Sequence, residues 1–337
     1  MKVNLKDIAR ATGFSLSTVS LALRGKGRIS EQNRSKILVR ASEMGYKCSP
    51  KKKSASKNRH LYFALIMQLE KSEFYPAFYK GFTDAAHNKN IEISLFNVFG
   101  NNERVEALIK NLIDIGYSAA VLFIPSLKQK QYQLLQNSIP EGFPVISCSN
   151  INNPVLDTVT FDAYSGAYLV AKHFYSQKLR RFGIIEGPQN KPEALFRTNG
   201  FTDFTKQRSD SKIVWSYIGD YTRYSGVCAF DNFENATEKP EAIFAVNDAM
   251  AVSFLDKARS KGWIIPEDLA IAGYDNLPMS EYNFPNISSV KTDFEALGEN
   301  AIAALLDRLN RPRPSQGMTS LLPVSLEVRE SSKIRFK

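Results

Sequence analysis

The chain has 337 residues, of which 43% are hydrophobic and 23% charged, and it carries a formal net charge of +10 at pH 7. It contains no apolar run of about 18 residues and no cleavable signal, which excludes a membrane-spanning segment and argues against export. Cys48, Cys148 and Cys228 lack the spacing of metal ligands, so neither a zinc site nor a disulfide framework is indicated, and free thiols suit the cytoplasm.

The positive charge is concentrated at the N-terminus. Residues 1–60 hold fifteen Lys and Arg against three acids, a net charge of +12, whereas the other 277 residues hold 29 bases and 31 acids. A basic segment of this kind is typical of proteins that contact DNA phosphates. A lysine-rich solubilising tail is the alternative, but such a tail would not need the periodic helices that occur in the same segment.

Residues 4–25 are predicted to form two short helices around a turn at Gly13. Glycine adopts the positive φ that ends one helix and redirects the chain, and Ser15 can cap the helix that follows. Val19 and Leu23 then share one face of that second helix. The facing side of the first helix is supplied by Ile8, Ala9 and Thr12. The pattern is a helix-turn-helix, which points to DNA.

A third helix is predicted after Ser30, which is suited to cap it, and it should end at Gly45. Its expected apolar stripe comprises Ile37, Leu38, Ala41 and Met44. Three such helices can bury one small core.

From residue 61 onward, short apolar runs alternate with amphipathic spans. A helix is expected over 78–89, and further helical spans lie between most of the strands. The predicted strands cover 62–67, 91–96, 119–124, 145–148, 182–185, 213–217, 242–246 and 269–272. The alternation indicates an α/β protein with parallel sheets, and roughly 280 residues are too many for one sheet, so two lobes are expected.

Several motifs resemble one known family. Asp7-Ile8-Ala9, Ser15-x-x-Thr18-Val19-Ser20, Ile29-Ser30 and Met44-Gly45-Tyr46 are similar to the DNA-binding headpiece of the lactose-repressor/galactose-repressor family, and the similarity continues to the C-terminus. The resemblance implies an all-α helix-turn-helix headpiece followed by a two-lobed α/β core of the type I periplasmic-binding-protein kind.

The resemblance also implies how the chain is divided. The headpiece should cover residues 1–48, a basic hinge 49–60 and the effector-binding and dimerisation core 61–337. Within the core, the N-lobe is expected to comprise 61–160 and 292–320, and the C-lobe 161–291 and 321–332. The chain should cross between the lobes near 159–161, 290–292 and 320–322. The effector is expected in the cleft between the lobes, at the C-terminal ends of the strands.

In the family, the second helix lies in the major groove, which assigns base contacts here to Leu16, Ser17 and Leu21. Leucine offers only apolar contact, for which a thymine methyl is the natural partner, and serine can donate or accept, so the operator sequence does not follow. Phosphate contacts are assigned to Thr18, Ser20, Arg24 and Ser30, which could equally be caps and surface residues.

The hinge departs from the family pattern. Relatives place a short helix there, with a leucine that wedges into the minor groove and kinks the DNA, and no leucine occurs here. Residues 51–59 hold five positive charges, including Lys51, Lys52 and Lys53, with no apolar face. We expect a flexible arm that follows phosphates and bends DNA weakly, and a solvated linker is the alternative.

Three motifs of the core match family positions that hold the effector. Arg197 follows Gly187-Pro188, and its guanidinium suits paired hydroxyls or a carboxylate, although a structural role at a helix start is the alternative. Asn247 ends a strand and is expected to face the cleft, with Asp248 capping the next helix. Asp275, in Gly273-Tyr274-Asp275-Asn276, is expected to accept hydrogen bonds from ligand hydroxyls.

Further effector contacts are expected from aromatic and hydroxyl side chains. Tyr75 and Tyr221 match aromatic positions that stack on the ligand, with packing between the lobes as the alternative role. Ser126 and Thr292 lie at strand ends, and Ser149 replaces the aspartate that is common in the family. The last change removes a charged acceptor for ligand hydroxyls.

No catalytic motif is present: the sequence lacks a nucleophile elbow, a phosphate-binding loop and a dinucleotide fingerprint, and its three histidines are scattered. The alternative classes are a sugar-binding receptor without a DNA role and an α/β hydrolase. We predict a cytoplasmic transcriptional repressor, without metal or cofactor, controlled by a sugar or related metabolite. It should bind a pseudo-palindromic operator as a homodimer, because no heptad repeat remains at the C-terminus to build a tetramer.

Overall fold

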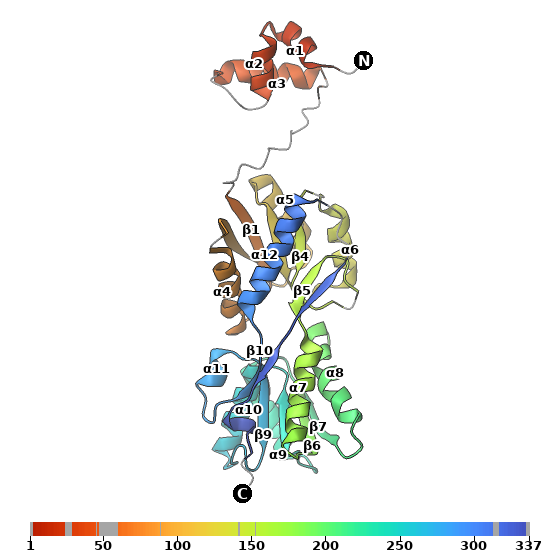
Figure 1. The fold of residues 1–337 in the computed structure, drawn as a ribbon, viewed down its shortest axis with the longest axis vertical. Coiled ribbons are helices and arrows are strands. Elements are labelled where there is room, and N and C mark those ends of the chain that lie inside the picture. The colour runs from red at the N-terminus through yellow and green to blue at the C-terminus, as the bar shows by residue number, and fades with distance from the viewer. Residues whose placement is uncertain are drawn as a thin grey trace. The chain divides into compact units, whose positions relative to one another are not determined.

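The computed structural model describes residues 3–23, 29–44, 46, 60–87, 89–140, 142–151, 153–312 and 317–334. The chain divides into two compact units, Met1–Arg59 and His60–Lys337, which are considered separately (Figure 1). Arg24, Lys51, Lys52 and Lys53 lie outside the described residues, as does the whole of the predicted hinge before His60. None of the helices in the described ranges is long and apolar enough to cross a bilayer.

The first unit is a bundle of three helices, α1 (Leu5–Thr12), α2 (Leu16–Leu23) and α3 (Glu31–Glu43). Asn4 caps α1: its side chain accepts hydrogen bonds from the amides of Lys6 and Asp7, and the Asp7 carboxylate accepts from the amide of Asn4. Gly13 ends α1 with a φ of +73°, as the sequence predicts. Ser15 Oγ accepts from the Thr18 amide at 3.1 Å and so begins α2.

The core of this bundle is small. It consists of the buried side chains of Ile8, Val19, Ala22, Ile37 and Ala41. Two predicted members differ: Leu38 is 43% exposed, and the Thr12 hydroxyl donates to the Ile8 carbonyl within its own helix. Leu38 directly follows Ile37, so it lies about 100° further around the helix and faces away from the core.

The N-lobe contains a six-stranded sheet in the order β11-β5-β4-β3-β1-β2, in which the paired strands are parallel. Its elements are β1 (Leu61–Met67), α4 (Phe74–His87), β2 (Ile91–Asn97), α5 (Arg104–Ile115), β3 (Ala119–Phe123), α6 (Gln129–Ser138), β4 (Val145–Ser147), β5 (Thr158–Phe161), α12 (Phe294–Asn310) and β11 (Thr319–Leu322). Helix α4 begins four residues before the predicted start, because Phe74-Tyr75-Pro76 forms its first turn, where proline is tolerated.

Alternate residues of β1 supply the two halves of the N-lobe core. Phe63, Leu65 and Met67 face α4 and α12, which lie side by side over one face of the sheet (Figure 1). Ala64 and Ile66 face the opposite side, where α5 and α6 cover the sheet. All five side chains are buried, as expected for a parallel sheet that is covered by helices on both faces.

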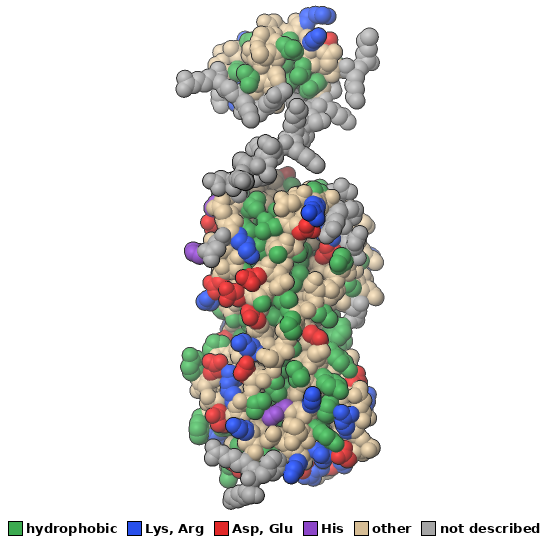
Figure 2. Space-filling view, viewed as in Figure 1, with side chains coloured by type: hydrophobic (Ala, Val, Ile, Leu, Met, Phe, Trp, Pro, Cys, Tyr) green, Lys and Arg blue, Asp and Glu red, His purple; other side chains and the backbone are tan. Residues whose placement is uncertain are grey.

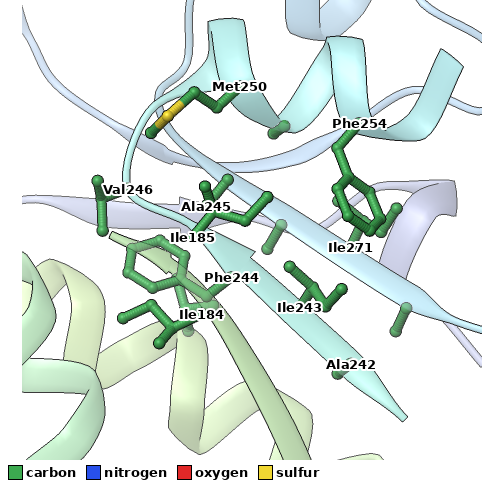
Figure 3. Close-up of a cluster of buried hydrophobic side chains, with 14 of the residues drawn as sticks. Ile184, Ile185, Ala242, Ile243, Phe244, Ala245, Val246, Met250, Phe254 and Ile271 are labelled. Carbon is green, nitrogen blue, oxygen red and sulfur yellow. The ribbon is translucent and has the colours of Figure 1, made fainter. Parts of the chain in front are cut away.

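The C-lobe repeats this plan with the sheet order β12-β10-β9-β8-β6-β7, in which β12 is antiparallel to β10. Its elements are α7 (Ala163–Ser176), β6 (Arg181–Glu186), α8 (Pro192–Lys206), β7 (Lys212–Ile218), α9 (Arg223–Glu234), β8 (Ala242–Ala245), α10 (Asp248–Ser260), β9 (Ala270–Asp275), α11 (Pro278–Glu281), β10 (Ser288–Lys291), β12 (Ser325–Glu327) and the short 3-10 helix η1 (Glu330–Ser332). Figure 3 shows the buried side chains between its strands and α10, with Phe254 pointing toward the sheet.

The chain passes between the lobes three times: after β5, after β10 and between β11 and β12 (Figure 1). The fold class expected from the sequence is therefore confirmed. On the face of the core shown in Figure 2, acidic and basic side chains are interspersed, in keeping with the near-neutral charge of this part of the chain.

Candidate functional site

A cavity of about 180 Å³ lies between the two lobes of the core. Its walls are rich in aromatic side chains from both sides. These are Phe74, Tyr75, Phe78, Phe123 and Phe161 of the N-lobe and Tyr221 and Tyr274 of the C-lobe. Helix α4 positions Phe74 and Tyr75, whereas Tyr221 follows β7 and Tyr274 lies near the end of β9. The cavity thus combines flat apolar faces with phenol groups, which suits a small ring-shaped ligand.

Arg197 and Asp275 form a buried ion pair in the C-lobe wall of this cavity. Arg197 Nη2 donates to Asp275 Oδ1 at 2.9 Å, and Nη1 donates to the Val246 carbonyl at 2.6 Å. The guanidinium also lies 3.8 Å from the centroid of the Tyr274 ring. Burial opposes the charge of Arg197, but the surrounding acidic groups, Asp275 first, raise its pKa overall. The pair therefore presents a charged, fixed guanidinium edge to the cavity.

Three residues with positive φ occur at or beside this wall: Tyr221 at +72°, Asp275 at +99° and Asn276 at +52°. Backbone of this kind is costly for residues other than glycine and persists only where the surroundings enforce it, commonly at binding sites. The Asp275 carbonyl accepts from the Thr292 hydroxyl, and the Asn276 amide donates to Ser289 Oγ, so the peptide unit that joins Asp275 to Asn276 is held at both of its polar groups.

The structure gives Asn247 the helix-capping role that was predicted for Asp248. Asn247 is the N-cap of α10, because its side chain accepts from the Met250 amide at 3.1 Å, and its amide group donates to the Tyr221 carbonyl. Asn247 still lines the cavity. Asp248 is fully buried behind the wall, where its carboxylate accepts from the Leu277 amide and the Ser289 hydroxyl.

Three other predicted contacts do not line the cavity. The Ser126 hydroxyl bonds to Gln68 and Asn102 within the N-lobe, and Ser149 Oγ accepts from the Ile124 amide. The Thr292 hydroxyl donates to the Asp275 carbonyl. The hydroxyls of Ser126 and Ser149 thus satisfy polar groups of the N-lobe, and that of Thr292 ties the segment after β10 to the end of β9. Tyr75, Arg197, Tyr221, Asn247 and Asp275, in contrast, come together in the walls as the sequence motifs predict.

The sequence motifs did not identify Glu193, Lys191 or Glu70, which all line the cavity. Lys191 Nζ of the C-lobe lies 3.2 Å from a carboxylate oxygen of Glu70 in the N-lobe, so this ion pair joins the two lobes. A second contact between the lobes is the hydrogen bond from the Met279 amide to Glu73. Neither could be found from sequence spacing, since the partners are 121 and 206 residues apart.

Four buried polar atoms of the cavity walls have no hydrogen-bond partner among the described residues. They are Glu193 Oε2, Arg197 Nε, Tyr221 Oη and Tyr274 Oη. Buried polar groups are rarely left without a hydrogen-bond partner. Arg197 Nε can only donate, a carboxylate oxygen of Glu193 accepts, and the two phenol groups can do either. A small polar ligand between the lobes could satisfy them.

The exposed face of α2 is the second candidate site. Leu16 and Leu21 are 44% and 40% exposed, and Ser17 is exposed beside them, while Val19 and Ala22 on the opposite face are buried. The remaining described phosphate candidates are Thr18, Ser20 and Ser30. Ser30 Oγ accepts from the Asn33 amide, and the Thr18 hydroxyl is hydrogen-bonded to Ser15, so both also act in helix capping.

Comparison with known proteins relates both sites to described families. Residues 4–49 match the bacterial regulatory proteins of the lacI family, and residues 171–332 match the periplasmic binding protein-like domain. The transcriptional repressor PurR of Photobacterium profundum is 24% identical over 335 residues, which cover 98% of each chain. The transcriptional repressor CytR of Escherichia coli K12 is 24% identical over 332 residues, which cover 98% of this chain and 96% of that protein.

Solved structures share the fold. The complex of the transcriptional regulator CelR with cellobiose superimposes with a TM-score of 0.70 at 22% identity and covers 98% of this chain and 100% of that one. The Lac repressor dimer bound to operator and the anti-inducer ONPF gives 0.73 at 20% identity, over 98% and 99% of the two chains. The chain thus joins a lacI-family helix-turn-helix domain to a periplasmic binding protein-like domain, as expected of a DNA-binding transcriptional regulator rather than an enzyme.

Proposed function

We propose that this protein is a repressor whose affinity for its operator is set by a small polar ligand bound between the lobes of the core. The proposal rests mainly on one observation: the cavity between the lobes has unpartnered buried polar atoms in its C-lobe wall and an ion pair that joins the two lobes, in a chain that also has a DNA-binding headpiece. A ligand there can change the free energy of one lobe arrangement relative to another, which is the requirement for allosteric control.

The DNA-binding half of the proposal assigns the readout to α2. Leu16, Ser17 and Leu21 form its exposed face and are proposed to contact base edges, with Thr18, Ser20 and Ser30 near phosphates. One headpiece of this size reads few base pairs, so useful specificity requires two. We therefore propose a homodimer on a pseudo-palindromic operator, as the Lac repressor dimer is bound to its operator. A regulator of this kind acts where the DNA is, in the cytoplasm.

The ligand-binding half assigns the recognition of a sugar-sized ring to Tyr75, Tyr221, Arg197, Asn247 and Asp275, which all line the cavity. A volume of about 180 Å³ is far above the roughly 10–15 Å³ that one water needs on the same measure, so the cavity admits a ligand of sugar size. Support comes from CelR, which has been solved with cellobiose, and from a relative in Escherichia coli K12, the ribose operon repressor.

The test has two parts. Fluorescence anisotropy or a gel shift with genomic fragments identifies the operator, and a thermal-shift screen of sugars and related metabolites identifies ligands that bind the folded core. The proposal requires that a hit from the screen changes operator affinity. A sugar receptor or a hydrolase would give no sequence-specific complex with DNA.

Two substitutions of Arg197 test whether the ligand binds in the cavity between the lobes. Arg197→Ala should abolish the thermal shift while non-specific DNA binding persists, because the headpiece is a separate unit. Arg197→Lys keeps a positive charge but cannot form the two bonds to Asp275 and Val246, so it should weaken binding strongly. A full response by both variants would show that the ligand binds elsewhere.

A further inference from the structure

Helix α2 presents an apolar strip to solvent, although it belongs to the basic part of the chain. Leu16 and Leu21 are 44% and 40% exposed, and Ser17 is exposed with them. At 100° per residue these three side chains fall within an arc of about 140°. Val19 and Ala22 are buried on the other side of the helix. The outward face of α2 therefore consists largely of two leucine side chains.

The residue types of α2 exclude the usual ways of identifying a base. Its sequence is Leu-Ser-Thr-Val-Ser-Leu-Ala-Leu, without a charged or an amide side chain. Arginine and lysine bind guanine by paired hydrogen bonds, asparagine and glutamine bind adenine, and acidic side chains accept from cytosine. The hydroxyls of Ser17 and Ser20 can pair with a donor or an acceptor, so they distinguish bases poorly.

The Ser17 hydroxyl also has a partner within the headpiece. Ser15 Oγ, which accepts from the Thr18 amide, lies 2.7 Å from Ser17 Oγ and 2.8 Å from Thr18 Oγ1. Because Ser15 has a single hydroxyl hydrogen, one of these two neighbours donates to it, and the three hydroxyls form one network at the start of α2. Leu16 and Leu21 therefore remain as the side chains of the outward face that distinguish one base pair from another.

We propose that α2 reads DNA through the C5-methyl groups of pyrimidines, with Leu16 and Leu21 each packed against one methyl group in every half-site. This inference rests on the proposed function, because it specifies what the DNA-binding half recognises. Among the four bases, only thymine presents a methyl group in the major groove. A leucine contact recognises the methyl group and not the hydrogen-bonding edge of the base, so 5-methylcytosine should be accepted at the same positions.

The size of the effect follows from the area of a methyl group. Full burial of one methyl group changes a binding constant by about fourfold. A partly buried contact that is made twice, once in each half-site, should therefore change it by about fivefold. Loss of a phosphate contact, in contrast, weakens binding to all sequences alike.

The test uses the full-length protein and duplexes that differ only by methyl groups. A binding duplex is first selected from random-sequence DNA, and its thymines are then replaced by deoxyuridine at symmetry-related pairs of positions. Deoxyuridine lacks the methyl group and keeps the base pairing. At two pairs of positions, affinity measured by fluorescence anisotropy should fall by about fivefold. At the same positions, 5-methylcytosine opposite guanine should bind about fivefold more tightly than cytosine opposite guanine.

Substitutions of the two leucines connect the methyl effect to these side chains. Leu16→Ala and Leu21→Ala should each lose the response to deoxyuridine at one pair of positions and keep it at the other. Both side chains are exposed and alanine favours helices, so the headpiece should keep its fold. Leu38→Ala is the matched control, because Leu38 is 43% exposed on α3, and it should keep both responses.

The outcomes separate this inference from the proposed function. If deoxyuridine changes affinity by less than about twofold at every position, or if the selected half-sites contain no thymine, the methyl inference is overturned and the repressor proposal stands. The same holds if Leu16→Ala and Leu21→Ala both keep the full response. If no duplex is selected over unrelated DNA, the DNA-binding half of the proposed function is itself contradicted. Should a variant fail to fold, the comparison of thymine with deoxyuridine on the unaltered protein still decides.

Discussion

Replacing the buried Asp248 by asparagine should make the protein less sensitive to alkaline pH. Asp248 is fully buried between α10 and β10, and its carboxylate accepts from the Leu277 amide at 2.7 Å and from Ser289 Oγ at 2.6 Å. Burial raises the pKa of Asp248 to about 8, and the nearby Asp275 adds to the rise. The folded protein therefore keeps a proton that the unfolded chain releases near the ordinary value of 3.8.

The sign of the effect follows from proton linkage. Between the two pKa values the folded state binds more protons than the unfolded state, so its stability falls as the pH rises. With about 1.36 kcal/mol for each pKa unit, the loss between pH 6 and pH 9 is about 2.5 kcal/mol, and it levels off above pH 8. Asparagine resembles the protonated acid and does not titrate, so Asp248→Asn should gain about 2.5 kcal/mol relative to the unaltered protein over this range.

Urea unfolding at several pH values between 6 and 9 measures this difference. The sequence contains two tryptophans, Trp215 and Trp263, which both pack against the C-lobe core, so their fluorescence reports the lobe that holds Asp248. Asp256→Asn is the matched control, because Asp256 is exposed on the same helix and its substitution should have an effect that does not change with pH. Parallel pH profiles of Asp248→Asn and the unaltered protein would refute the reasoning.

Three further substitutions test packing, lobe closure and DNA contact. Gly200→Ala should destabilise the C-lobe by about 1–3 kcal/mol in urea unfolding, because the new Cβ would lie 2.1 Å from a backbone oxygen of α7. Gly142→Ala is the control and should not destabilise the protein, because its Cβ would meet no atom within 4 Å. Glu70→Gln removes the inter-lobe ion pair with Lys191, and calorimetry should show cleft-ligand affinity reduced by about two- to fivefold. Leu21→Ala should weaken operator binding by about fivefold and leave non-specific DNA binding unchanged, since leucine offers no charge to phosphates. Equal losses of affinity for operator DNA and for DNA of unrelated sequence would contradict the role of Leu21 in base contact.

Local signals made the headpiece predictable from the sequence. Gly13 with its positive φ and Ser15 and Ser30 as caps all act within one helical turn, so their effect can be inferred without the rest of the fold. The buried strands of the core were also predictable, because a parallel sheet covered on both faces needs continuous apolar runs, as in Leu61–Met67.

Strand β10 was missed because its stability depends on distant polar partners. Ser288 and Ser289 are fully buried, which their residue type does not suggest. Their polar groups are satisfied by Ser331 and Arg329 near the C-terminus and by Asp248. Asp248 was predicted to be a cap because the sequence shows that it precedes a helix. The sequence does not show that the buried Ser289 lies beside it.

The candidate site was predictable where family motifs fix the position of a side chain, and not where its role depends on the surroundings. Arg197, Asp275 and Tyr221 line the cavity as their motifs predict. Ser149, by contrast, bonds to a backbone amide of its own lobe. Glu193 could not be singled out, because only the fold shows that nearby cations are paired with other carboxylates.

The most direct test of the account measures operator affinity and cleft occupancy in the same protein. Fluorescence anisotropy of labelled operator DNA is titrated with the protein, without ligand and with a saturating ligand from the thermal-shift screen. If the two sites are coupled, the two dissociation constants differ by about 5- to 150-fold, and operator DNA changes the ligand's affinity by the same factor. Identical DNA-binding curves with an Arg197-dependent ligand bound to the cleft would contradict the coupling of the two sites.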